Sequence, residues 1–315
     1  MKEAWANLEG LSPFKFLNRS EDRTYQILTE IASERGLSVF PKVRLIDAFD
    51  RETASLDPLQ ETFAIRAHVD FLLVNADRVP VMAIEFDGPS HLSDKQQRRD
   101  ETKNQICEQA GLPLIRATSS YLTHHYGGMT ALRWLVETTE LAIAFEAAQE
   151  AGAIPWEEGF DATLIHDPKT STFPYWVSAN AQMKLNALRR QGVIKRMAHR
   201  MTSCVDGPEA LNVAIAELPD GRWIAQTGRM RDQALPFYYR ELLDMVTTCE
   251  LARKVEAFMA GDQSTPLHPE VVARRLKPRF ERYRPGSGSS CGGLGNELDQ
   301  ALGMGTNNYT WGLQW

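Results

Sequence analysis

The sequence predicts an α/β protein in which a mixed sheet is flanked by helices, followed by a smaller α+β region. Two apolar segments, HVDFLLV at 68–74 and VMAIEFDG at 81–88, are joined by a short turn and indicate a β-hairpin. A polar segment at 94–110, which ends before Gly111, indicates a long helix. The resulting order of helix, strand, hairpin, helix, strand and helix is typical of a layered α/β domain.

The elements around the hairpin follow from local signals. We expect the first helix to begin with Ser20 as its N-cap and to end at Gly36. The segment LSVFPKVRLIDAF after it predicts a strand, and Pro41 places that strand at a sheet edge or bulge. Beyond the helix at 94–110 we expect a short buried strand and then a helix over 127–150. These elements together define a first domain over residues 15–150.

The remainder of the chain has a different character. Residues 151–177 are rich in turn-forming and aromatic residues and predict a linker or arm. Residues 178–284 predict an accessory α+β region, with a helix over 178–202 and a hairpin built on a PDG turn. The tail at 285–315 is rich in glycine, which favours disorder.

Composition bounds the class of protein. The chain has 315 residues, 43% of them hydrophobic, and a net charge of −6, which excludes a uniformly basic protein that coats nucleic acid. Its apolar runs are too short to cross a membrane, its four cysteines form no C-x-x-C pair, and its N-terminus has no secretory pattern. We therefore expect a cytoplasmic protein with reduced thiols and no membrane partner. The ATP-binding motif G-x-x-x-x-G-K-[ST] is absent. The pattern G-x-S-x-G occurs as GSSCG at 288–292, within the glycine-rich tail, so no serine-hydrolase elbow is expected.

Two carboxylates stand inside apolar strands. Asp70 and Glu85 would be costly to bury unless they pair with a cation, and on neighbouring strands they could bind one Mg²⁺ or Mn²⁺. A structural ion pair, or a strand end exposed to water, is the alternative. Asp87 leaves the strand on the same face as Glu85, although it could also be a plain turn residue.

The helix at 94–110 could complete such a centre. Asp100 and Lys103 are three residues apart and share a helix face, so Lys103 could stabilise charge or orient a water molecule. Asp100 could hold Lys103 or His91 in place, or it could be one charge on a solvated helix. His91 could act as a base, or it could be a loop histidine bonded to backbone.

The spaced elements VDFLLV, AIEFDGPSH, RRD-x-x-K and AGLPLIR resemble the PD-(D/E)XK nuclease superfamily over about residues 15–125. More narrowly, they resemble a bacterial family of uncharacterised nuclease-fold proteins and, in outline, the very-short-patch repair endonucleases. The resemblance implies Mg²⁺- or Mn²⁺-dependent endonuclease activity on DNA before RNA, in bacterial DNA repair, restriction or phage defence. It also implies that Asp70 and Glu85 are the first and second acids, with the Phe86 carbonyl as a further metal ligand.

The sequence departs from the superfamily at one position. Asp87 stands where E-x-K members carry lysine, and Lys103 is the candidate for a lysine that has moved to the next helix. Glu21 resembles the additional helix acid of many members. If Lys103 does not reach the acids, the alternative is a catalytically inert module that binds nucleic acid or a partner protein.

Basic residues mark candidate nucleic-acid contacts. Two of them, Arg98 and Arg99, lie on the helix at 94–110, and a cluster follows at 274–284. The segment 181–202 carries no acid and adds Lys184, Arg189, Arg190, Lys195 and Arg196. These residues could instead form a solvated face or pair with acids elsewhere. A protein partner or a homodimer remains open.

Overall fold

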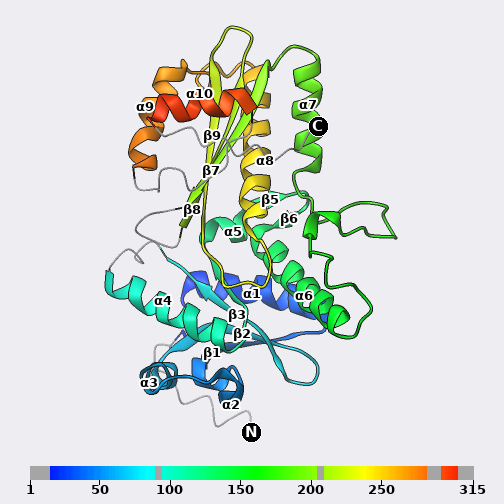
Figure 1. Ribbon diagram of the computed structural model, residues 1–315, viewed down its shortest axis with the longest axis vertical. Helices are drawn as coiled ribbons and strands as arrows, with labels where there is room; N and C mark the ends of the chain where they lie inside the picture. Colours follow the sequence, from blue (N-terminus) through cyan, green and yellow to red (C-terminus); the bar gives the residue numbers. More distant parts are fainter. Residues whose placement is uncertain (1–14, 89–93, 204–208, 282–291, 304–315) are drawn as a thin grey trace, which may run out of the picture.

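The computed structural model describes residues 15–88, 94–203, 209–281 and 292–303, and it has the mixed α/β architecture expected from the sequence (Figure 1). The first half is built on a four-stranded sheet in the order β1-β2-β3-β4. The first three strands are antiparallel, and β4 runs parallel to β3. The strands are β1 (Ser38–Arg44), β2 (His68–Val74), β3 (Pro80–Phe86) and β4 (Leu114–Ala117).

Helices cover both faces of this sheet. Along β2 and β3 alternate residues point to opposite faces, so Phe71 and Ile84 pack on α1 while Leu72 and Ala83 pack on α4. The first face carries α1 (Arg19–Arg35), α5 (Ser119–Thr123) and α6 (Ala131–Glu150), and the second carries α3 (Pro58–Arg66) and α4 (Asp94–Gln109). The remaining elements of this half are η2 (Leu45–Asp47), α2 (Arg51–Ala54) and the small hairpin of β5 (His125–Tyr126) and β6 (Met129–Thr130).

The first helix shows how local chemistry sets element ends. Its N-cap is Asn18, whose side chain accepts from the amides of Ser20 and Glu21, while the Glu21 side chain accepts from the Asn18 amide. The prediction of Ser20 as the cap is wrong by two residues, because this reciprocal capping box satisfies more of the free amides than Ser20 alone could. The predicted end at Gly36 is confirmed, with φ of 69° in the left-handed region.

The second half is a three-stranded antiparallel sheet between two pairs of helices. The predicted hairpin is confirmed as β8 (Glu209–Glu217) and β9 (Trp223–Arg231), which pair antiparallel along their whole length. One face of this sheet packs on α7 and α8, and the other on α9 and α10. The elements are η3 (Ala162–Leu164), α7 (Ala179–Arg190), β7 (Arg196–Ser203), β8 (Glu209–Glu217), β9 (Trp223–Arg231), α8 (Arg240–Met259), α9 (Pro269–Phe280) and α10 (Gly292–Leu302).

The helix predicted over 178–202 is wrong in its second part. The helix ends at Arg190, Gly192 follows with φ of 77°, and Arg196–Ser203 forms β7. Ala198, Arg200 and Thr202 are buried while the residues between them are half-buried, which is the period of a strand. Pairing with β8 therefore decided the structure of a segment that had been predicted as helix.

The two halves share buried contacts. The largest apolar cluster contains Leu28 of α1 together with Met230 of β9 and Leu242 of α8. The segment at 151–177 also contributes to it, because Tyr175 and Val177 are buried there and the Trp134 indole donates to the Tyr175 carbonyl at 2.8 Å. The segment predicted as a linker or arm at 151–177 therefore packs against the cluster that the two halves share.

Part of the predicted disordered tail is also helical. In α10, Leu294, Leu298 and Leu302 are buried at intervals of four residues and pack on the second sheet. Asp299 lies 3.0 Å from Arg200, and both side chains are almost fully buried. The disorder prediction is thus wrong for Gly292–Leu302, and residues 285–291 and 304–315 lie outside the described residues.

Replacing Leu298 by alanine should lower the free energy of unfolding by about 2–5 kcal/mol, because a fully buried leucine leaves a cavity when truncated. Urea denaturation followed by circular dichroism measures this change. The control is Gln300→Ala, which alters an exposed residue of the same helix. Equal stability of the two variants would show that α10 does not dock on the sheet.

None of the described helices has the length and apolar content needed to cross a membrane. Cys107 and Cys249 are free and buried, while Cys204 and Cys291 fall outside the described residues. Burial raises the pKa of Cys107 to about 12, so this thiol stays protonated and unreactive.

Candidate active site

A row of four charged residues crosses the first sheet near one end of its strands. Lys42 and Asp70 fall between two paired positions of β1 and β2, and Glu85 pairs with Arg116 across β3 and β4. The antiparallel register of β2 and β3, continued one residue beyond Phe71 and Ile84, sets Asp70 opposite Glu85. Two carboxylates therefore lie side by side in the middle of the sheet, with one cation on either side.

The alternation of the strands explains why these groups meet α4. Leu72, Ala83 and Leu114 face α4, and Asp70, Glu85 and Arg116 each lie two residues further along the same strands. Their side chains consequently leave the sheet on the α4 face. This places Glu85 where Lys103 of α4 can reach it.

Asp70 is held by two donors. Its Oδ1 lies 2.6 Å from Lys42 Nζ, and its Oδ2 accepts the Phe86 amide at 2.9 Å. The same Lys42 ammonium lies 2.8 Å from Oε1 of Glu21, so Glu21 joins the cluster through Lys42. Burial lowers the pKa of Lys42, but its bonds to Asp70 and Glu21 outweigh that effect, and the resulting pKa is above the ordinary value.

Lys42 is the residue that sequence reasoning missed on this side. Its backbone has φ of 54°, in the left-handed region that a residue with a long side chain adopts at a cost of about 1–3 kcal/mol. Such strain persists only where the surroundings impose it, and here the lysine bridges two carboxylates. The sequence signal was the predicted edge or bulge at Pro41, one residue earlier.

Glu85 is paired with the helix lysine. Lys103 Nζ lies 2.7 Å from Glu85 Oε1 and donates to the His68 carbonyl at 2.8 Å. Burial raises the pKa of Glu85, the Lys103 ammonium opposes this shift, and the Asp70 carboxylate adds to it. The structure thus pairs Lys103 with Glu85 and sets Asp70 opposite Glu85 on the neighbouring strand, although Lys103 follows Asp70 by 33 positions in the sequence.

Asp87 and Asp100 belong to a separate buried network. Arg231 of β9 lies 2.6 Å from Asp87 and 3.2 Å from Asp100, and Arg116 lies 3.3 Å and 3.5 Å from the same two carboxylates. Asp100 also accepts from Gln96 at 3.1 Å. The described contacts join the Asp100 carboxylate to arginines and Gln96, and its proposed role in holding Lys103 or His91 stays a prediction. His91 itself lies outside the described residues.

This network joins the two halves of the protein. Gln233 accepts from the Arg116 amide at 2.6 Å and donates to the Arg116 carbonyl at 3.1 Å. Neither Arg116 nor Arg231 was singled out from the sequence. Arg116 carried a signal, since it is a charged residue within the apolar segment PLIRA.

Several of the basic residues expected to contact nucleic acid are paired within the chain. Lys184 forms an ion pair with Glu256, Lys195 lies 3.3 Å from Glu217, and Arg196 pairs with both Glu217 and Glu297. For these three residues the structure shows the pairing with acids that was left open as an alternative. Lys184 and Lys195 are nevertheless exposed, as are Arg98 and Arg99 on α4 and Arg189 and Arg190 on α7.

The donor set at Asp70 and Glu85 fits a hard divalent cation. Within the described part of the chain no three His, Cys, Asp or Glu side chains gather as a metal site. Mg²⁺ commonly binds through one or two carboxylates and keeps several waters, so two carboxylates suffice. The amide of Phe86 donates to Asp70. In a strand, the amide and the carbonyl of one residue point to the same side, so the Phe86 carbonyl oxygen also points toward the Asp70 strand. The carboxylates of Glu21, Asp70 and Glu85 outnumber the two lysines by one, which leaves a negative charge for a cation.

Comparison with known proteins places the similarity on this half of the chain. A family model described as "Protein of unknown function (DUF2726)" matches residues 14–127, which contain the whole first sheet and Lys103. An uncharacterized protein of Haemophilus influenzae (strain Rd) is 28% identical over 120 residues, which cover 35% of this chain and 59% of that protein. The chain thus aligns with about three-fifths of this relative's length. No solved structure matches.

Proposed function

We propose that this chain is a metal-dependent nuclease that hydrolyses phosphodiester bonds, with DNA as the first expected polymer and RNA as the second. The observation that carries the proposal is the pair of carboxylates, Asp70 and Glu85, opposed across neighbouring strands and reached by Lys103. Such an enzyme would act in the cytoplasm, in bacterial DNA repair, restriction or phage defence, as the sequence resemblance implies.

Each residue has a chemical task in this proposal. A bound Mg²⁺ or Mn²⁺ supplies Lewis acidity and a water molecule of lowered pKa. Asp70 and Glu85 provide the oxygen ligands, and the Phe86 amide fixes the orientation of Asp70. Lys103 holds a positive charge beside Glu85, where it stabilises negative charge on a phosphate oxygen or orients the attacking water. Lys42 holds Asp70 in place and remains charged, since its own pKa is raised.

Metal affinity should depend on pH through Glu85. A carboxylate must lose its proton to bind a metal, and the pKa of Glu85 is raised above its ordinary 4.5 by burial. Mn²⁺ affinity should therefore fall as pH is lowered from 8 toward the raised pKa, before an exposed glutamate would protonate. Titration of Mn²⁺ followed by electron paramagnetic resonance, from pH 8 down to the ordinary carboxyl pKa of 4.5, measures this. An affinity that begins to fall only at pH 4.5, in protein that stays folded, contradicts the assignment.

Replacing Lys103 by methionine should lower kcat roughly 10²- to 10³-fold, because one preorganised charge at the reacting phosphate is lost. The methionine keeps most of the volume of the buried stem but leaves Glu85 without its partner, so circular dichroism must show that the variant is folded before kcat is compared. The matched control is Lys169→Met, at an exposed site in the segment between the halves. A Lys103 variant as active as the control would remove Lys103 from the site.

The polymer is identified by incubating the wild-type protein with single- and double-stranded DNA and RNA, in Mg²⁺, in Mn²⁺ and in EDTA. We expect cutting of at least one polymer that requires metal. A folded protein that cuts none of them and binds no Mn²⁺ would favour the inert module that binds nucleic acid or a partner protein.

A further inference from the structure

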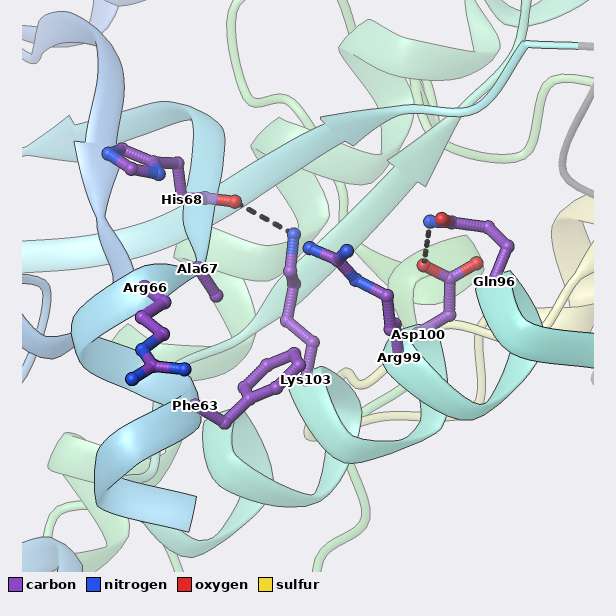
Figure 2. A pocket seen from close by; sticks show the side chains of 8 residues that line it. All are labelled: Phe63, Arg66, Ala67, His68, Gln96, Arg99, Asp100 and Lys103. Atoms are coloured by element: carbon purple, nitrogen blue, oxygen red, sulfur yellow. Dashed lines mark hydrogen bonds between the residues drawn. The ribbon is translucent and has the colours of Figure 1, made fainter. Parts of the chain in front are cut away.

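A groove lies between α3 and α4, beside the carboxylate pair. Its inner part is a cavity of about 220 Å³ with a polar lining, and Figure 2 shows Lys103 reaching across it to the His68 carbonyl. Because Lys103 also binds Glu85, this cavity adjoins the candidate active site directly. The side chains used below are those of Phe63, Arg66, His68, Arg99 and Lys103.

The inner cavity is positively charged. Arg66 of α3 and Arg99 of α4 are exposed, and within the described residues neither forms an ion pair (Figure 2). Asp100 also lines the cavity, but its carboxylate is engaged by Arg116 and Arg231. In a chain with a net charge of −6, these two exposed arginines, beside a Lys103 that is paired with Glu85, form a local site for an anion.

The outer part of the groove is apolar. A second hollow of about 340 Å³ shares Phe63, Arg66 and Arg99 with the first and extends along α3 to Leu59. The Leu59 side chain is 84% exposed, which is unusual for a leucine and leaves an apolar surface open to a ligand. The groove therefore offers cations at its inner end and apolar surface at its outer end.

We propose that this groove binds one nucleotide of the substrate strand next to the phosphate that is cut. Arg66 and Arg99 bind its phosphate, and Phe63 and Leu59 contact its base. This assignment rests on the proposed nuclease function and names its substrate class. A base that lies in this groove cannot also be stacked in a duplex, so the substrate is single-stranded DNA or RNA or an unpaired strand end.

The test measures binding apart from cutting. Fluorescence anisotropy of a short labelled oligothymidylate is recorded in EDTA, so no metal-dependent step contributes. We expect Arg66→Ala and Arg99→Ala each to weaken binding roughly tenfold, because each removes a charge-assisted bond to phosphate. The matched control is Arg78→Ala, which alters an exposed arginine in the β2–β3 turn, at the other end of these strands. That variant should bind like the wild type.

Competitors define the ligand. Thymidine 5′-phosphate should displace the oligonucleotide better than thymidine or inorganic phosphate alone, and Phe63→Ala should weaken the advantage of the nucleotide over phosphate. A blunt duplex of the same length should bind more weakly than the single strand. Stronger binding of the duplex would overturn the single-strand assignment.

The outcomes separate this proposal from the nuclease itself. If the wild type cuts nucleic acid but Arg66→Ala and Arg99→Ala bind like Arg78→Ala, the groove is not the subsite and the nuclease stands. If the two groove variants lose binding but the wild type cuts nothing, the groove binds nucleotide and the nuclease is wrong. Wild-type protein that does not bind the oligothymidylate at all overturns the groove assignment.

Discussion

Replacing Asp70 by asparagine should lower metal-dependent cleavage roughly 10³-fold or more, with little loss of folded protein. The asparagine keeps the size of the side chain and an oxygen that can accept the Phe86 amide, so the strand geometry should survive. It removes the negative charge that binds the cation and balances Lys42. The loss of a metal ligand removes several kcal/mol of transition-state stabilisation, which accounts for the size of the effect.

The control for this variant is Asp77→Asn, at an exposed position in the turn between β2 and β3. It changes the net charge by the same amount at the other end of the same strand. Asp70→Asn protein that cuts at a rate close to that of Asp77→Asn would show that Asp70 has a structural role only.

The second large effect concerns stability. Replacing Arg231 by alanine should lower the free energy of unfolding by about 3–5 kcal/mol, because Asp87 and Asp100 would lose a partner while both stay buried. Arg231 comes from β9, so the same change should weaken the contact between the two halves. Chemical denaturation followed by tryptophan fluorescence measures the loss.

The comparison for Arg231 is Arg229→Ala, two residues earlier on the same strand and exposed. That substitution should change stability by about 0.5 kcal/mol or less. If the two variants are equally stable, the arginine network does not hold the halves together.

Much of the first half could be predicted from the sequence because its signals are local. The hairpin strands are continuous apolar runs, and the helix at 94–110 ends at Gly111, which adopts φ of 62°. The second half was harder because long-range contacts decide its elements. The strand β7 exists through pairing with β8, and α10 folds because its leucines meet the second sheet. Glycine-rich composition around α10 hid that apolar spacing.

The carboxylates of the candidate site could be predicted from the sequence, but their cationic partners could not. A carboxylate within an apolar strand is visible in the sequence, which identified Asp70 and Glu85. Their cationic partners are visible only when the register of the sheet is known, and this is why Lys42 and Arg231 were missed. The different partners of Asp70 and Asp87 could not be predicted either, because they also depend on the register of the sheet. Asp70 pairs with Lys42, whereas Asp87 pairs with the buried Arg116.

The central claim is that Asp70 and Glu85 bind one divalent cation. The most direct measurement is an anomalous difference map from a crystal of the protein soaked in Mn²⁺. We predict a peak between the two carboxylates, with oxygen ligands about 2.0–2.2 Å away. A fully soaked crystal with no peak there, and with Lys103 and Lys42 still bound to the two carboxylates, would contradict the claim and favour a structural charge cluster.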